Sequence, residues 1–128
     1  ASLEVSDIEP KIIKTGNISH KRDIVDINDA IKAYIALAKN TPEIGEYLVC
    51  SGSSIALSEI LGFMTSASTK EIIHITEKDR GFGEAIDRYY SHQHLTAATG
   101  WTPETPAQKS AIDVLEFKRR ELQGDKVR

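Results

Sequence analysis

The sequence has little of several residue types, and each shortage excludes a class of protein. Cys50 is the one cysteine among 128 residues, so no internal disulfide can form and a reducing cytoplasm is the expected compartment. No apolar run approaches the roughly 20 residues of a transmembrane helix, so we expect no membrane partner. Basic residues do not predominate: 16 Lys and Arg stand against 19 Asp and Glu, which gives a net charge of −3 and disfavours nucleic-acid binding.

Most short catalytic motifs are also missing. There is no Gly-x-Gly-x-x-Gly, no phosphate-binding Gly-Lys-Ser/Thr loop, and no Gly-x-Ser-x-Gly around Gly52. His92 and His94 could lie on one face of a strand, but zinc needs three or four ligands, so surface histidines are favoured over a metal site. Cys50 follows apolar residues without a neighbouring cation, which favours a buried, inert thiol.

The length fits a single domain, and residues 1–128 are treated as one unit. The chain starts at Ala1, not Met, in a segment typical of the middle of a sequence. We therefore expect it to be a piece of a longer protein.

Strand-like and helix-like segments alternate along the chain, which predicts an α/β fold. The predicted strands are a short one at 12–13 that ends at the Gly16-Asn17 turn, one at 46–50 and one at 70–75; the predicted helices are 26–39, 57–66 and 107–122. Residues 77–94 lack periodicity and predict a structured loop with a short strand or turn. Trp101 is interpreted as a core anchor.

Three predictions are specific enough to be tested residue by residue. In the first helix, Asp26 is the predicted N-cap, and the predicted buried face is Ala30, Ile31, Tyr34, Ile35 and Ala38. The strand 46–50 has consecutive apolar residues, typical of a parallel strand buried on both faces. The last helix is predicted to start with a capping box from Thr105 to Gln108, with one side formed by Ile112, Leu115 and Leu122.

Two arginines lie beside aspartates in predicted loops: Arg22 before Asp23, and Arg80 after Asp79. Each pair could be a solvated salt bridge, worth at most about 1 kcal/mol. Alternatively, two guanidinium groups facing one cleft would suit a diphosphate, because each can form bidentate hydrogen bonds. The residues alone do not separate these alternatives.

The loop from Asp79 to His94 has a composition suited to a nucleotide. Gly81 and Gly83 give it backbone freedom. Its polar groups suit phosphate and ribose hydroxyls better than they suit one another; they are Arg80, Glu84 and Arg88. We expect the loop to become ordered over bound nucleotide.

Three motifs, which together cover about 110 residues, resemble a known family. Gly16-Asn17 with the segment 21–34 is similar to the Gly-Asn…Arg-Asp-Phe-x-Asp-Val segment of extended short-chain dehydrogenase/reductases. Residues 45–52 are similar to that family's last Rossmann strand, and 99–103 to its Gly-Trp-x-Pro segment. Within the family, the resemblance is closest to the GDP-mannose 4,6-dehydratases and GDP-4-keto-6-deoxymannose reductases.

The resemblance implies the C-terminal part of such an enzyme: the last Rossmann helix and strand plus the small substrate-binding subdomain. It implies a nucleotide-diphosphate sugar as ligand, with Arg22 and Arg80 on the diphosphate or ribose, Glu84 on the ribose, and Asn17 in the same site. The sequence departs from the family at Gly81, which replaces a proline, and at residues 91–94, where an Asp-x-x-Lys is usual. These departures leave the contacts of the loop, and the substrate, open.

The family's catalytic Tyr-x-x-x-Lys is absent, because the residues four positions after the four tyrosines are Ala38, Ser51, Gln93 and His94. The resemblance therefore implies no catalytic residue in this chain and no NAD(P) bound by it alone. NAD(P), the dinucleotide-binding part or a partner chain, and a homo-oligomer are expected of the full enzyme. The alternatives are an epimerase, or a non-catalytic domain that binds a nucleotide or a protein partner.

Overall fold

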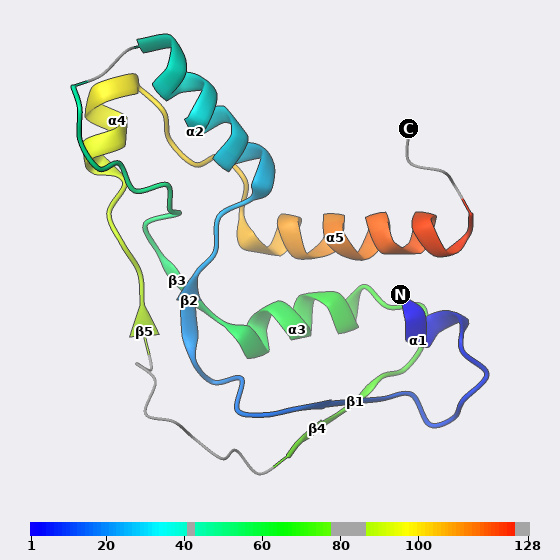
Figure 1. Cartoon of the computed structure of the whole chain (residues 1–128). Coiled ribbons are helices and arrows are strands. Elements are labelled where there is room, and N and C mark those ends of the chain that lie inside the picture. The colour runs from blue at the N-terminus through cyan, green and yellow to red at the C-terminus, as the bar shows by residue number, and fades with distance from the viewer. Residues whose placement is uncertain (41–42, 78–86, 125–128) are drawn as a thin grey trace.

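The computed structural model describes residues 1–40, 43–77 and 87–124. Helices and strands alternate over much of this chain (Figure 1). The helices are α1 (Ser2–Val5), α2 (Ile27–Asn40), α3 (Leu57–Ser66), α4 (Gln93–Thr99) and α5 (Ala107–Leu122). The strands are β1 (Ile12–Thr15), β2 (Lys21–Asp23), β3 (Ser54–Ala56), β4 (Ile73–Thr76) and β5 (Asp87–Arg88). The predicted helix 57–66 is confirmed, and the other two predicted helices lie within one residue of their predicted positions.

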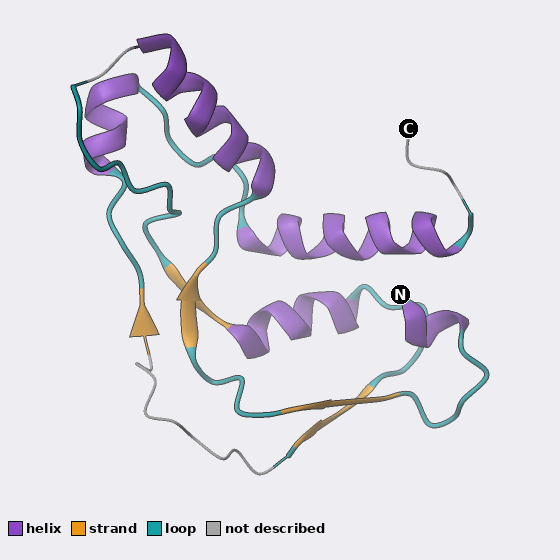
Figure 2. Ribbon diagram, in the orientation of Figure 1, coloured by secondary structure: helices purple, strands orange, loops and turns teal. Residues whose placement is uncertain are grey.

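The strands form two small sheets, and the β1–β4 pair lies along the edge of the molecule below α3 (Figure 2). β1 and β4 pair in parallel, with Ile12 opposite Ile73. In the second sheet β2 is central; it pairs antiparallel with β3 and parallel with β5. This mixed architecture with parallel pairing confirms the predicted α/β class.

The core lies where α2 meets α4, and α3 and α5 lie side by side further along the molecule (Figure 1). Ala33, Leu95 and Trp101 form its buried centre. Partly buried apolar residues surround it: Val25, Ala36, Leu37, Tyr47 and Val49. The prediction that Trp101 is a core anchor is confirmed. α4 itself was missed in the sequence, because its seven residues are too few to show a helical period.

The buried face of α2 was predicted wrongly. Asp26 is confirmed as its N-cap, since its Oδ1 accepts the N–H of Asn28 at 2.8 Å. The helix, however, turns Asp29, Ala30 and Ala33 inward. Four of the five residues predicted to be buried are exposed: Ile31, Tyr34, Ile35 and Ala38. The small alanine side permits close contact with α4, and the larger apolar side is left without a covering element among the described residues.

The segment 46–50 was predicted to be a strand of the buried parallel type, although this chain lacks the parallel neighbours that such a strand needs; the structure forms no strand there. It is extended but joins no sheet within the described part of the chain. Tyr47 and Val49 pack against the core, whereas Leu48 between them is exposed. The physical reason is that neither sheet reaches it, so its backbone has no strand to pair with and only one of its faces is covered.

The start of α5 also differs from the prediction. No side chain caps this helix, whose N-cap is Pro106, so the capping box from Thr105 to Gln108 does not form. The N–H of Thr105 instead donates to the Asp29 carboxylate at 2.7 Å. Leu115 is buried as predicted, but Leu122 is exposed.

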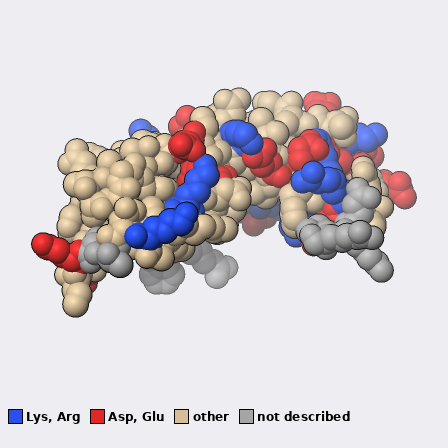
Figure 3. All heavy atoms as spheres, turned by 90° about the horizontal axis from the view of Figure 1, so that it is seen from above, with Lys and Arg blue, Asp and Glu red and all other residues tan. Residues whose placement is uncertain are grey.

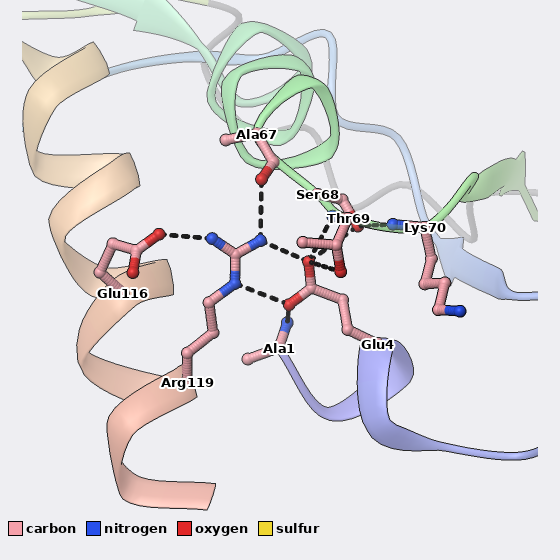
Figure 4. Close-up of polar contacts among 8 residues, drawn as sticks. All are labelled: Ala1, Glu4, Ala67, Ser68, Thr69, Lys70, Glu116 and Arg119. Atoms are coloured by element: carbon pink, nitrogen blue, oxygen red, sulfur yellow. Dashed lines mark hydrogen bonds and ion pairs between the residues drawn. The ribbon is translucent and has the colours of Figure 1, made fainter. Parts of the chain in front are cut away.

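A polar network fastens α1 to α3 and α5 (Figure 4). The Glu4 carboxylate accepts two hydrogen bonds from Arg119 of α5, and also the N–H of Thr69 at 2.8 Å. Arg119 donates to the carbonyl oxygen of Ala67, just after α3, at 2.8 Å. The Arg119 guanidinium therefore lowers the pKa of Glu4 far below its usual value.

Acidic and basic side chains alternate over much of the surface seen from above, and neither sign forms a large separate patch there (Figure 3). This agrees with the small net charge of −3. Among the described residues, no helix is both long and apolar enough to span a bilayer.

Candidate functional site

The central strand β2 places two arginines next to each other. In the parallel pairing of β2 with β5, the Cα partner of Arg22 is Arg88. Side chains of directly paired residues project to the same face of a sheet and lie close enough to interact. The structure thus brings together two of the predicted substrate-binding residues, which are far apart in the sequence.

Like charges on paired strands repel each other, so this arrangement costs stability unless an anion or other acceptor lies nearby. Arg22 donates a hydrogen bond from Nη1 to the carbonyl oxygen of Lys21 at 2.8 Å. Guanidinium groups offer paired N–H donors that match the oxygens of phosphate. The pair is therefore chemically suited to an anionic group with several oxygens.

Asp23 does not form the salt bridge with Arg22 that was one of the predicted alternatives; the ion pairs of the described residues do not include one. Its carboxylate instead accepts three backbone N–H groups. These come from Ser51 at 2.7 Å, Gly52 at 3.0 Å and Tyr90 at 3.3 Å. Sequence reasoning missed this role, since hydrogen bonds to distant backbone have no local signal.

The turn after residue 50 packs closely against the start of α4. Gly52 has φ +78, and a Cβ added to it would lie 3.0 Å from Cδ2 of His92. The His92 ring meets Trp101 edge to face, with centroids 5.9 Å apart, and its Nδ1 lies 2.9 Å from the hydroxyl of Thr96. The Ser-Gly turn therefore contacts the Arg-Asp motif directly, through Asp23, and the Gly-Trp motif indirectly, through His92.

Trp101 extends these contacts to α2. Its Nε1 donates to the backbone carbonyl of Asp29 at 3.0 Å. The Asp29 side chain is 1% exposed and accepts the N–H groups of Glu104 and Thr105 at 2.9 and 2.7 Å. Burial acts to raise the pKa of Asp29, but these amides together with Lys32 outweigh it and lower the pKa. The buried carboxylate thus stays ionised and holds α2 to the segment before α5.

The other predicted substrate-binding residues have different outcomes. Asn17 lies in the loop between β1 and β2, where its Oδ1 accepts the N–H of Ser19 at 2.9 Å and its amide nitrogen lies 3.5 Å from His20. Among the described residues, Asn17 contacts this loop and not the arginine pair. Arg80 and Glu84 lie outside the described residues, so their roles stay predictions.

A separate cavity of about 550 Å³ lies between the 51–55 segment and the starts of α3 and α5. Its lining includes four residues with hydroxyl groups and two with carboxylates: Ser51, Ser53, Ser54, Thr105, Glu59 and Glu104. Neither Arg22 nor Arg88 contributes to its lining. It was not predicted from the sequence. It adjoins the candidate site through Ser51, which donates its N–H to Asp23, and through Ser54 and Ile55, which pair with Asp23 and Arg22.

Metal and cysteine chemistry find no support in the described part of the chain. In residues 1–40, 43–77 and 87–124, no group of His, Cys, Asp and Glu is arranged to hold a metal ion. His94 stacks on Tyr47 with centroids 4.6 Å apart, whereas His92 is directed at Trp101. Cys50 is buried as predicted; burial, with the nearby Asp23 charge, raises the pKa of its thiol and makes it a poor nucleophile.

No family model matches the sequence. GDP-6-deoxy-D-mannose reductase from Pseudomonas aeruginosa is 28% identical over 105 residues, which cover 80% of this chain and 34% of the reductase. This chain is therefore similar to part of one nucleotide-sugar reductase. It spans about a third of the length of this relative, so the activity of a whole enzyme does not follow from the match.

Solved structures agree with this relationship. RMD from Pseudomonas aeruginosa, complexed with NADPH, has a TM-score of 0.69 at 25% identity; the match covers 84% of this chain and 36% of RMD. UDP-glucose 4-epimerase from Bifidobacterium longum, in complex with NAD+ and UDP, has a TM-score of 0.73 at 16% identity, covering 95% of this chain and 38% of the epimerase. The latter shows a shared fold alone. The chain thus corresponds to part of a Rossmann-type enzyme, as predicted.

The described residues do not fit a nicotinamide dinucleotide. Such cofactors are held where a strand passes through a glycine-rich turn into a helix. Here β3 passes directly into α3 between Ala56 and Leu57, and β1 leads through Gly16 and a loop into another strand. We therefore assign no chemical step in this chain to NAD(P).

Proposed function

We propose that this chain is the nucleotide-sugar-binding portion of an NAD(P)-dependent nucleotide-sugar 4,6-dehydratase or 4-keto reductase, of the GDP-mannose type. In this proposal Arg22 and Arg88 bind the diphosphate. The observation that supports it is their direct pairing across β2 and β5, because paired residues direct their side chains to the same face of a sheet. A diphosphate would relieve their repulsion and use their paired donors.

The relatives support the ligand class. The reductase that matches 80% of this chain is named for a GDP-linked deoxy sugar. The chain has no catalytic Tyr-x-x-x-Lys, so hydride transfer at the sugar would belong to the part of the enzyme outside this chain. That part would also hold NAD(P), and the complete enzyme would be a homo-oligomer. Arg80 and Glu84 would complete the contacts to phosphate and ribose, and Asn17 would contribute from its loop.

Binding of free nucleotides to the 128-residue chain tests the proposal. With ¹⁵N-labelled protein, GDP should shift the backbone signals of Arg22 and Arg88, and GMP should bind more weakly because it offers one phosphate fewer. Mannose alone should leave both signals unchanged. Equal affinity for GMP and GDP, or shifts confined to other parts of the chain, would contradict a diphosphate site at this arginine pair.

Hydrogen exchange gives a second readout on the same protein. GDP should slow exchange across residues 87–94, while α5 stays unchanged because it lies outside the site. Identical exchange with and without GDP would show that this segment is not part of the proposed site.

The coding sequence upstream separates the enzyme from a non-catalytic binding domain: a glycine fingerprint with Tyr-x-x-x-Lys supports the enzyme, and their absence supports the binding domain. A preference for UDP over GDP would favour the epimerase alternative.

A further inference from the structure

We infer that Asp23 is a positioning residue, whose carboxylate holds Arg88 beside Arg22 through backbone hydrogen bonds. The inference rests on the proposed diphosphate site and explains how that site is kept in place. Asp23 follows Arg22 directly in β2, and Tyr90, whose N–H it accepts, lies two residues after Arg88. Any movement of the Tyr90 backbone away from Asp23 would therefore move Arg88 as well.

The pairing of β2 with β5 needs this support because it is very short. β5 has two residues, and only Lys21 with Asp87 and Arg22 with Arg88 are partners. A two-residue ladder has little stability of its own, and repulsion between the two arginines weakens it further. The hydrogen bond from Tyr90 to Asp23 continues the connection just beyond the last paired residues, where the ladder itself ends.

The same carboxylate is held in place from the other side. Its Oδ1 accepts the N–H of Ser51 at 2.7 Å, and its Oδ2 accepts the N–H of Gly52 at 3.0 Å. The turn at Gly52 is in turn packed against His92, two residues after Tyr90. Hydrogen bonds to an ionised acceptor are stronger than neutral ones, so one side chain joins three segments: β2, the 51–52 turn and the start of residues 90–92.

A purely electrostatic role for Asp23 predicts the opposite result, which makes the inference testable. If Asp23 acted only through its charge, its removal would strengthen the binding of an anion nearby. If Asp23 positions Arg88, its removal should weaken binding despite the lost negative charge. The two roles therefore differ in the sign of the effect on GDP affinity.

The experiment compares Asp23→Ala and Asp23→Asn with the unmodified chain. In the free protein, Asp23→Ala should speed amide exchange at Ser51, Gly52 and Tyr90 and remove the backbone nuclear Overhauser effects between residues 22 and 88. It should also weaken GDP binding about tenfold, the effect of losing one charge-assisted contact. Asp23→Asn keeps one acceptor oxygen without the charge. Its amide exchange rates and its GDP affinity should therefore lie between those of Asp23→Ala and those of the unmodified chain.

Asp87→Asn is the matched control. It removes a negative charge from β5, beside Arg88, without touching the Asp23 hydrogen bonds, and it should tighten GDP binding slightly or leave it unchanged. Unchanged or tighter GDP binding in Asp23→Ala, or unchanged exchange at the three amides, would overturn the positioning role. If the unmodified chain binds no GDP, the proposed function fails, and the contacts between residues 22 and 88 in the free protein still decide whether Asp23 positions Arg88.

Discussion

A Cβ placed on Gly52 would lie 3.0 Å from Cδ2 and 3.2 Å from Nε2 of His92. The absence of a side chain at Gly52 thus lets the turn after residue 50 approach α4, and it lets its backbone reach Asp23. His92 cannot move away freely, because its ring also contacts Trp101 of the core. The packing around the candidate site therefore depends on glycine at this position.

Gly52→Ala should reduce the free energy of unfolding by about 2–4 kcal/mol, from left-handed backbone strain at φ +78 together with the clash. Urea denaturation followed by Trp101 fluorescence measures this. Gly100→Ala is a control for strain alone, because φ is +74 there but no atom lies within 4 Å of the added Cβ. Gly62→Ala, in the open middle of α3, should stabilise the chain by about 0.5–1 kcal/mol. Equal effects at positions 52 and 100 would show that the His92 contact does not matter.

Arg22→Ala should weaken GDP binding by about 2–5 kcal/mol, the cost of removing one partner from a close charge pair. Arg22→Lys should recover only part of the affinity, because an ammonium group lacks the planar fork of donors. Isothermal titration calorimetry on both variants tests this. Lys21→Ala is the control, since successive side chains of a strand point to opposite faces. Full affinity in Arg22→Ala would leave Arg22 a structural surface residue.

Stability should fall in acid. The pKa values of Glu4, Asp26 and Asp29 are lowered in the folded chain; the causes are Arg119 for Glu4, the Ser110 hydroxyl for Asp26, and backbone amides that outweigh burial for Asp29. A carboxylate with a lowered folded pKa adds stability above its unfolded pKa, and this is lost as pH falls toward the folded value. We expect nearly constant stability from pH 7 to 5 and a steep loss below about pH 4.

Glu4→Gln tests the source of this pH dependence. It should lower stability at pH 7 by about 1–3 kcal/mol, because a charge-assisted bond to Arg119 is lost. It should also make the loss between pH 5 and 3 shallower, as measured by urea denaturation at each pH. Glu71→Gln, at an exposed position, is the matched control and should change neither quantity. An unchanged acid slope in Glu4→Gln would show that other groups cause the acid loss.

The outward face of α2 should promote self-association. Ile31, Tyr34 and Ile35 are 47%, 63% and 48% exposed, and they form one continuous apolar stripe on this helix. We expect the isolated chain to be marginally stable or to associate through this stripe and the unpaired segment 46–50. Light scattering should show that Ile31→Lys with Ile35→Lys shifts the chain toward monomer without loss of helix content. A stable monomer before any substitution would contradict this.

Ala33→Lys is the contrasting variant for this experiment. Ala33 lies on the opposite side of α2, is 0% exposed and contacts the core, so a lysine there should unfold the chain. If both sets of substitutions unfold the protein, the stripe is part of the core in solution. If only Ala33→Lys unfolds the protein, the Ala33 side of α2 packs in the core and the Ile31 side is available to contact other parts of an enzyme.

The sequence predicted elements well where a local signal was strong. The periodicity of residues 57–66 and 107–122 located two helices, and an aspartate before an apolar pattern located the start of α2. It failed where the outcome depended on distant partners. Thr105 was predicted to cap a helix, but its N–H donates to the Asp29 carboxylate. Residues 46–50 were predicted to be a strand, but no strand of the described residues pairs with them.

The candidate site shows the same division. Arg22 and Arg88 could be selected from their residue type and loop context, as could the motifs that resemble nucleotide-sugar enzymes. The pairing of Arg22 with Arg88 could not be predicted, because it depends on the register of two short strands from distant parts of the chain. The role of Asp23 was missed for the same reason, since all three of its backbone donors lie at least 28 residues away.

The sequence by itself therefore determined the positions of α2, α3 and α5, the α/β class and the resemblance to nucleotide-sugar enzymes, because periodicity, caps and motifs are properties of neighbouring residues. Only the tertiary structure decided which side of α2 is buried, that Asp23 binds backbone amides instead of Arg22, and that Arg22 lies beside Arg88. Each of these depends on which segments meet in space. That is settled by competition among all possible partners for the same buried surface and the same hydrogen-bonding groups.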